Sequence, residues 1–166
     1  MPETFLTPAF EWLQDTPISI YIRESAFWYP WLIALHVMGN VTSVGLILAL
    51  DFRLLGWGMK KTPISAIFDQ LRPWSIAGIL FQMSTGLMLF WSEPMKCYES
   101  KWFWIKMVSM GLALGNAMLF DKTLYPMVKQ WDTDPKDLTG RVKFAGASSL
   151  VLWATVIYAG RWLAYG

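Results

Sequence analysis

The sequence predicts an all-α integral membrane protein, a four-helix bundle with additional amphipathic helices at the membrane surface. Hydrophobic residues make up 55% of the chain and charged residues only 16%. Eleven tryptophans and ten phenylalanines are far more than a soluble chain of 166 residues needs. Four apolar runs also approach the ~20 residues that a spanning helix requires. A chain of this length, residues 1–166, is expected to form a single membrane domain.

The four predicted spans are bounded by prolines and charged residues. They cover residues 27–50, 74–91, 102–120 and 144–166. Pro30 falls in the opening turn of the first span, where a missing N–H costs little, and Pro73 precedes the second. The third and fourth spans carry one cationic residue each near an end, Lys106 and Arg161. All four runs are therefore uninterrupted at their centres.

Two further segments are amphipathic. Residues 8–25 mix aromatic and charged side chains and are too polar to cross a membrane, so we expect one or two short helices on its surface. Residues 51–73 contain apolar side chains at helical spacing, which predicts a separate surface helix after the first span. The apolar positions there are Ile64, Ile67, Phe68 and Leu71.

Lysine and arginine are unevenly distributed between the two sides of the predicted bundle. The loops after the first and third spans hold Arg53, Lys60, Lys61, Arg72, Lys122, Lys129, Lys136, Arg141 and Lys143. The opposite side holds Arg23, Lys96, Lys101, Lys106 and Arg161. Because cytoplasmic loops carry the excess of positive charge, this pattern predicts a bacterial inner-membrane protein with both termini in the periplasm.

His36 is the only histidine and lies within the first apolar run. Nine residues separate it from Phe27, which places it ~14 Å along the helix, near the midplane of a ~30 Å hydrocarbon core. Gly39, Asn40 and Ser43 share its helix face. That face is small and polar, so it is predicted to point into the bundle.

Several roles explain an imidazole at this depth. His36 could join helices by hydrogen bonding to Ser43 or to Gln82 of the second span. A proton relay is not favoured, because the spans hold no Asp, Glu or second His at a similar depth. A neutral imidazole is also an axial ligand of haem iron, and haem b fits between four helices.

Such a haem would also need a second axial ligand, for which methionine is a candidate, and basic side chains to pair with its propionates. Met83 and Met110 lie near the middle of their spans, although methionine on an apolar helix also serves as adaptable packing. Two copies of His36 could instead share one haem, with Gly39 and Ser43 permitting close approach of two subunits. Lys106 and Arg161 lie just inside the periplasmic surface, where they would either meet haem propionates or extend to lipid headgroups.

The chain resembles a family of small four-span bacterial membrane proteins of unknown function. The matching stretches are LHVMGNVTSVGLILALDFRLLG (35–56), LRPWSIAGILFQMSTGLMLF (71–90), FWIKMVSMGLALGNAMLF (103–120) and YAGRWLAYG (158–166). More loosely, the chain is similar to haem-b membrane cytochromes and to the membrane domain of copper-resistance proteins. Many members of the four-span family have a second histidine where this chain has Asp121. The resemblance implies the four-span fold but no activity.

Three functional hypotheses follow, and whether the protein is an enzyme stays open. The first is electron transfer through haem b bound by His36, as a homo-oligomer or as a subunit of a membrane redox complex. The second is copper handling along a histidine and methionine path, for which the candidates are His36, Met83, Met88, Met107 and Met110. The third is a cofactor-free accessory subunit. A net charge of +2 with dispersed basic residues excludes a nucleic-acid surface.

Three polar residues outside this site have structural interpretations. Asp51 and Arg53 are predicted to hold the turn after the first span through hydrogen bonds and charge pairing. They are not expected to bind a cofactor, since ~22 Å of helix separates Asp51 from His36. Cys97 is the only cysteine, which excludes an internal disulfide and predicts a free thiol in a short loop.

Overall fold

The structure, a computed structural model, describes residues 6–59, 61–132 and 140–165, and its regular elements are all helical. Four helices are long and apolar enough to cross a membrane, which confirms the predicted four-span architecture. They are α3 (Trp28–Leu54), α4 (Ile64–Ser92), α6 (Lys101–Thr123) and α8 (Gly140–Leu163). α3, α6 and α8 differ from the predicted spans by a few residues at their ends, as is usual for helix boundaries, whereas α4 begins ten residues before the predicted span 74–91.

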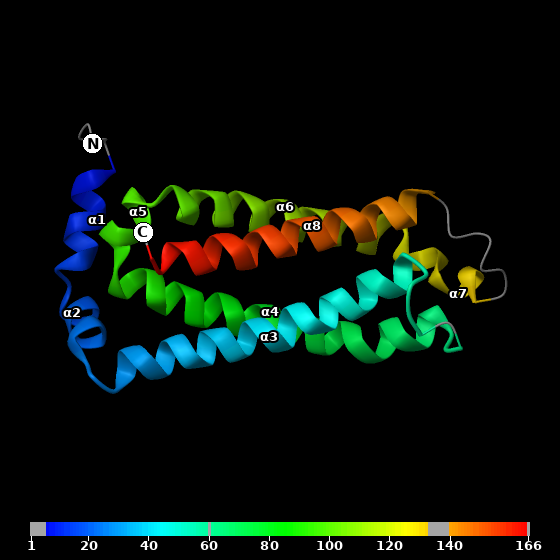
Figure 1. Ribbon diagram of the computed structural model, residues 1–166, viewed down its shortest axis with the longest axis horizontal. Coiled ribbons are helices and arrows are strands. Elements are labelled where there is room, and N and C mark those ends of the chain that lie inside the picture. Colours follow the sequence, from blue (N-terminus) through cyan, green and yellow to red (C-terminus); the bar gives the residue numbers. More distant parts are fainter. Residues whose placement is uncertain (1–5, 60, 133–139, 166) are drawn as a thin grey trace.

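Short helices close the two ends of the bundle (Figure 1). At one end, called here the cap end, lie α1 (Thr7–Gln14), α2 (Pro17–Glu24) and α5 (Pro94–Glu99). At the other, called the α7 end, lie the connection between α3 and α4, the 3-10 helix η1 (Tyr125–Met127) and α7 (Val128–Trp131). The final turn of α8 returns to the cap end (Figure 1).

The N-terminal helices run across the cap end, as expected for helices at a membrane surface (Figure 1). Thr16 begins α2 by accepting a hydrogen bond from the Ser19 backbone N–H at 3.4 Å, and Pro17 occupies the first helical position. Ser19 is fully buried, and its hydroxyl donates to the Ser92 carbonyl at the end of α4. On the outer side Trp12 is 71% exposed. The cap is therefore tied to the bundle through polar contacts and presents aromatic rings outward.

The predicted separate helix after the first span is wrong, because residues 64–72 form the first part of α4. The helix continues through Pro73, although a proline removes one backbone hydrogen bond. Packing explains the continuity: Ile64, Ile67 and Phe68 are buried in one hydrophobic cluster with residues of α3, α6, α7 and α8. These contacts hold the segment in line with the rest of α4.

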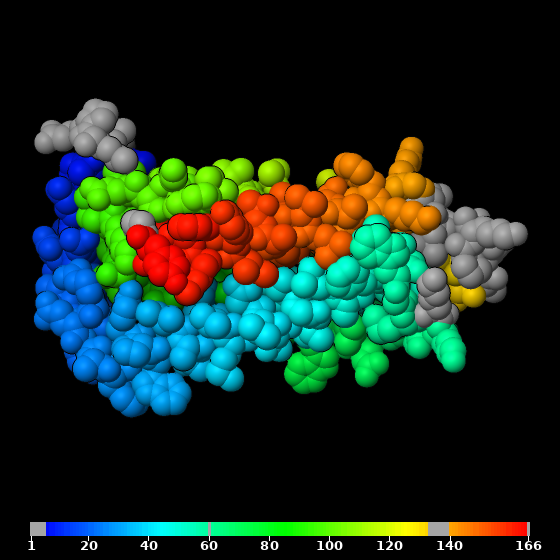
Figure 2. Space-filling view, viewed as in Figure 1, coloured from blue at the N-terminus to red at the C-terminus, as the bar shows by residue number. Residues whose placement is uncertain are grey.

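The bundle consists of two antiparallel helix pairs. α3 packs along α4, α6 packs along α8, and the pairs meet mainly where α3 contacts α8. Figure 2 shows α8 lying against α3 toward the α7 end. A second buried cluster fills the middle of this junction with Val44, Ala113, Trp153 and Val156.

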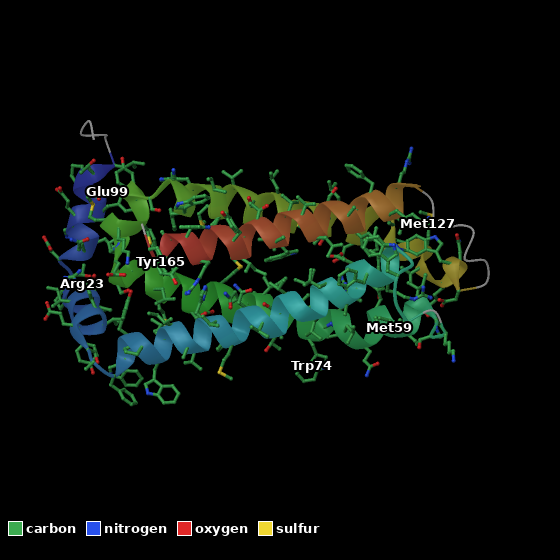
Figure 3. The ribbon with its side chains drawn as sticks, in the orientation of Figure 1. Arg23, Met59, Trp74, Glu99, Met127 and Tyr165 are labelled. Atoms are coloured by element: carbon green, nitrogen blue, oxygen red, sulfur yellow. The ribbon has the colours of Figure 1, made fainter. Side chains whose placement is uncertain are left out.

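Large apolar side chains cover the outside of the bundle, which fits contact with a lipid bilayer. Val41 of α3 is 71% exposed, and Trp74 projects away from α4 (Figure 3). Further exposed aromatic residues lie near the helix ends, where interfacial belts form. They are Trp28, Trp31, Trp57, Trp104 and Trp162.

Candidate functional site at His36

His36 lies on the inner face of α3 and is half-buried against α4. Its ring rests on Gly86, where an added Cβ would come within 3.1 Å of the imidazole Cε1 atom. A glycine at this position therefore makes room for the ring. The prediction that His36 points into the bundle agrees with this placement.

Both ring nitrogens of His36 have partners on α4. Nε2 lies 2.9 Å from Nε2 of Gln82, and Nδ1 lies 2.9 Å from the Thr85 hydroxyl oxygen. The amide nitrogen of Gln82 donates, so the Nε2 atom of His36 accepts and the ring proton resides on Nδ1. The Thr85 hydroxyl accepts this proton and donates in turn to the Phe81 carbonyl at 3.1 Å. With the Gln82 amide in this orientation, His36 is assigned as a neutral imidazole with its proton on Nδ1.

Gln82 connects this site to the helix interface. Its other amide atom, Oε1, is buried and has no hydrogen-bond partner. A Cβ added to Gly39 would lie 2.8 Å from that oxygen, so the small residue on α3 is what admits the amide. A buried acceptor without a donor is unfavourable, which leaves Gln82 less firmly held than His36.

The small face predicted around His36 exists, but α4 of the same chain covers it. Ser43 is 1% exposed and packs against Gly78. Its hydroxyl donates to the Gly39 carbonyl at 2.8 Å and not to His36. Asn40 is half-buried beside it. Gly39 and Ser43 therefore mediate helix packing within one chain, and this face is not free for a second copy.

The two candidate methionines, Met83 on α4 and Met110 on α6, differ in exposure. Phe90 of α4 and Phe103 of α6 stack with ring centroids 5.5 Å apart. Met83 precedes Phe90 by seven residues and Met110 follows Phe103 by seven, so each lies two turns further in on the same face. Met83 is 46% exposed, whereas Met110 packs against the buried cluster in the middle of the bundle.

The two basic residues predicted near the site differ in position and in exposure. Lys106 is half-buried, and its side chain passes within 3.8 Å of the position of a Cβ on Gly160. Its ammonium group lies within electrostatic range of the His36 imidazole. Arg161 is exposed and hydrogen-bonds to Tyr165 at the end of α8. The structure thus brings Lys106, but not Arg161, toward His36.

Thr85 is the site residue that sequence reasoning missed. The signal for it is the spacing of small and polar residues on α4, where Gly78, Gln82, Thr85 and Gly86 share one helix face. This face matches the small face of α3 in character. Comparing the two faces at equal depth would have paired His36 with Thr85 as well as with Gln82.

Asp51 and Arg53 behave differently from the prediction. The Arg53 guanidinium donates to the Thr62 carbonyl at 3.0 Å and so holds the connection after α3, as expected. Asp51 instead hydrogen-bonds to Ser149 of α8. The ion pairs found in the part of the chain that the structure describes do not join Asp51 to Arg53, so the predicted charge pairing is wrong. Asp51 and Arg53 are two residues apart on one helix, so their side chains point to different sides of it.

Asp121 lies at the α7 end, near the end of α6, and is therefore distant from His36 in the middle of α3. Its carboxylate pairs with Arg72 of α4 through two hydrogen bonds of 2.8 Å and 3.1 Å. Among residues 6–59, 61–132 and 140–165, no group of three or more His, Cys, Asp or Glu side chains could hold a metal ion. His36 is thus a single imidazole among amide, hydroxyl and ammonium groups.

Comparisons with curated proteins and with solved structures gave no match. The match comes from a family model, the family of unknown function DUF6644, which aligns with residues 10–166. That range covers all four spans, the whole of α2 and all of α1 except its first residues. The protein therefore belongs to this family of small four-span membrane proteins.

Proposed function

We propose that the protein binds haem b in a bacterial inner membrane and takes part in electron transfer, with Nε2 of His36 as an axial ligand. The observation that carries the proposal is the hydrogen bond from Nδ1 of His36 to Thr85. A ligating histidine needs its other ring nitrogen held by an acceptor, which fixes the tautomer and the ring orientation. Bound haem would supply one-electron redox chemistry.

Gln82 is compatible with this role as a displaceable partner of Nε2. Its amide has one unsatisfied oxygen, so moving the side chain away from His36 gives up a single good hydrogen bond. The ring itself stays in place, because Thr85 and Gly86 lie on α4 and position it independently of Gln82.

Two α6 residues complete the proposed site. Met110 is directed toward the core of the bundle and is the candidate for the second axial position, in preference to the exposed Met83. Lys106 supplies a cation beside His36 for a carboxylate such as a haem propionate. Arg161 is exposed, so it receives no support as a partner of a haem propionate. A haem shared between two copies of His36 also receives no support, because α4 covers the face that a second subunit would have to approach.

A cofactor-free role as an accessory subunit of a membrane complex is the second candidate. It is favoured by the hydrogen bonds at both nitrogens of His36, which join α3 to α4 without any ligand. Copper handling has less support. Met83, Met88 and Met107 are between 40% and 48% exposed and do not form an interior path with His36.

The proposed orientation places the cap end in the periplasm. The helices α1 and α2 and the end of α8 share that end (Figure 1), and an even number of spans requires both termini on one side. Of the larger group of Lys and Arg residues, those that the structure describes fall at the α7 end, as the cytoplasmic side requires, while Lys60 and Lys136 lie outside the described residues. We propose a homo-oligomer or a redox complex as the assembled form.

Optical spectra of the protein purified in detergent test the proposal. We expect a Soret band, with sharp α and β bands after dithionite reduction, and loss of haem in His36→Ala. Met110→Leu should lose haem or lower its reduction potential, because thioether ligation raises that potential, and Met83→Leu is the matched control. Full haem content in His36→Ala would overturn the proposal.

Gln82→Leu separates haem binding from the cofactor-free role and covers the case in which His36→Ala does not fold. If Nε2 of His36 is a ligand, haem content in Gln82→Leu is unchanged or higher. If His36 only joins helices, the purified protein is colourless and Gln82→Leu lowers the stability of the bundle. Bound copper in a colourless preparation would favour the copper hypothesis instead.

A further inference from the structure

Asp51 is an acidic side chain buried inside the bundle. It is 5% exposed and is the only acidic residue in the buried set of the described chain. It lies in the last turns of α3, toward the α7 end, on the side that meets α8. The proposed role of His36 does not use it.

The side chain of Asp51 is closely packed and has few hydrogen-bond partners. Ser149 of α8, itself 7% exposed, hydrogen-bonds to the carboxyl group. The second carboxyl oxygen, Oδ2, is buried without any partner. One turn from Ser149, a Cβ on Gly146 would lie 3.3 Å from the Asp51 carbonyl oxygen, so α3 and α8 almost touch there. The backbones thus enclose the carboxyl group.

Among the residues that the structure describes, no cation forms an ion pair with this carboxyl group. The facing residues of α8, Gly146 and Ser149, are uncharged. Arg53 follows on the same helix, but its guanidinium donates to the Thr62 carbonyl and its Nε atom is buried without a partner. At this end of α4 and α6, Arg72 and Asp121 pair with each other, and Asp69 and Lys122 are exposed. An ionised Asp51 would therefore be a buried, unpaired charge, which is strongly disfavoured.

We propose that Asp51 is a buried proton-binding site at the contact between α3 and α8. The proton comes from water at the α7 end, forms an O–H bond on the Oδ2 atom that has no partner, and returns to the same water on release. Binding converts a buried charge into a neutral acid, so the protonated form favours the close α3–α8 contact. Release of the proton loosens that contact or draws water to the carboxylate. The site is independent of any haem at His36.

Infrared difference spectroscopy of the full-length protein in detergent tests the proposal. A protonated carboxyl group has a C=O stretch that a carboxylate lacks. We expect this band to persist at neutral pH, well above the ordinary aspartate pKa of about 3.9. It should be absent from Asp51→Asn and present in Asp69→Asn, the matched control for an exposed acid at the same end. A band unchanged in Asp51→Asn, or no band in the wild type at neutral pH, would overturn the proposal.

Two further arms keep the test decisive. Ser149→Ala removes the hydrogen bond to the carboxyl group, so the C=O band should shift in frequency without disappearing. An unshifted band would contradict the assignment to Asp51. This variant keeps the test usable if Asp51→Asn does not fold. Titration with sodium chloride against choline chloride at fixed pH distinguishes a metal cation from a proton. Bleaching of the band by sodium alone would show a sodium site and overturn the proton assignment.

Discussion

Gly78 of α4 lies directly against Ser43 of α3. A Cβ added to Gly78 would come within 2.8 Å of the Ser43 Cβ atom and 3.1 Å of its Cα atom. The obstacle includes backbone, which cannot rotate away as a flexible side chain does. This contact sets the distance between the two helices that carry His36 and its partners.

Gly78→Ala is therefore expected to destabilise the protein by about 1–3 kcal/mol, the usual range for overpacking. The free energy of unfolding in mixed micelles, followed by circular dichroism, measures the effect. Gly111→Ala on α6 is the matched control, because nothing lies within 4 Å of a Cβ at that position. Equal stability of the two variants would show that α3 and α4 do not meet at Ser43.

Asp132→Ala should loosen the beginning of α4. The Oδ1 atom of Asp132 accepts hydrogen bonds from the backbone N–H groups of Ile64 at 2.5 Å and Ser65 at 3.2 Å, so a residue beyond α7 serves as the helix cap. Loss of a cap costs about 1 kcal/mol, and the amides of Ile64 and Ser65 should exchange faster with deuterium. Asp132→Asn keeps an acceptor oxygen and should preserve protection. Unchanged exchange in Asp132→Ala would contradict the capping role.

The same cap predicts an acid dependence. Burial raises the pKa of Asp132, but hydrogen bonds from Ser65 and Ile64 outweigh it and bring the pKa below its ordinary value. The capping contribution is therefore present above about pH 4, the unfolded pKa, and is lost as pH falls through the lower folded value. Exchange of the Ile64 and Ser65 amides, compared with neighbouring amides in wild type and Asp132→Asn, should show this loss in the wild type only.

Cys97 should react slowly with thiol reagents while the protein is folded. Burial, assisted by the negative charge of Glu93, raises the pKa of the Cys97 thiol to about 11. At pH 8 roughly one thiol in a thousand is then ionised, and the thiolate is the reactive form. Mass spectrometry after timed alkylation should show little modification in mild detergent and complete modification in SDS. Equal rates in the two detergents would place Cys97 at the surface.

Reporter fusions at the C-terminus should score periplasmic. The prediction rests on the excess of Lys and Arg at the α7 end and on the shared end of α1 and α8. A fusion in the connection between α3 and α4 is the matched control and should score cytoplasmic. Reversed scores at both positions would show that the bundle has the opposite orientation in the membrane, with Lys106 on the cytoplasmic side of His36.

The four spans could be predicted because each is a run of apolar residues close to the length that a bilayer demands. Pro73 misled the prediction about α4, since a proline usually marks a helix boundary. What keeps the helix continuous is packing of Phe68 on Phe120, whose rings stack with centroids 5.5 Å apart. Such a contact between distant residues has no local sequence signal.

At His36 the sequence predicted the inward face and Gln82 as a partner, because both follow from helical spacing and depth. It did not predict that Met83 would be exposed or that Lys106 would turn inward. Those outcomes depend on the rotation of α4 and α6 about their axes. In an apolar span every face is hydrophobic, so amphipathic periodicity does not fix that rotation.

The two helix pairs have a consequence for biogenesis. α3 and α4 are consecutive spans, and so are α6 and α8, so each pair is a hairpin whose contacts form between neighbouring parts of the chain. The first hairpin can complete its glycine-mediated packing before the second has left the ribosome. Only the junction between α3 and α8 must wait for the last span. A released fragment ending after α5 would thus already contain all the residues that place the ring of His36 against α4, and assembly would finish by docking of the second hairpin.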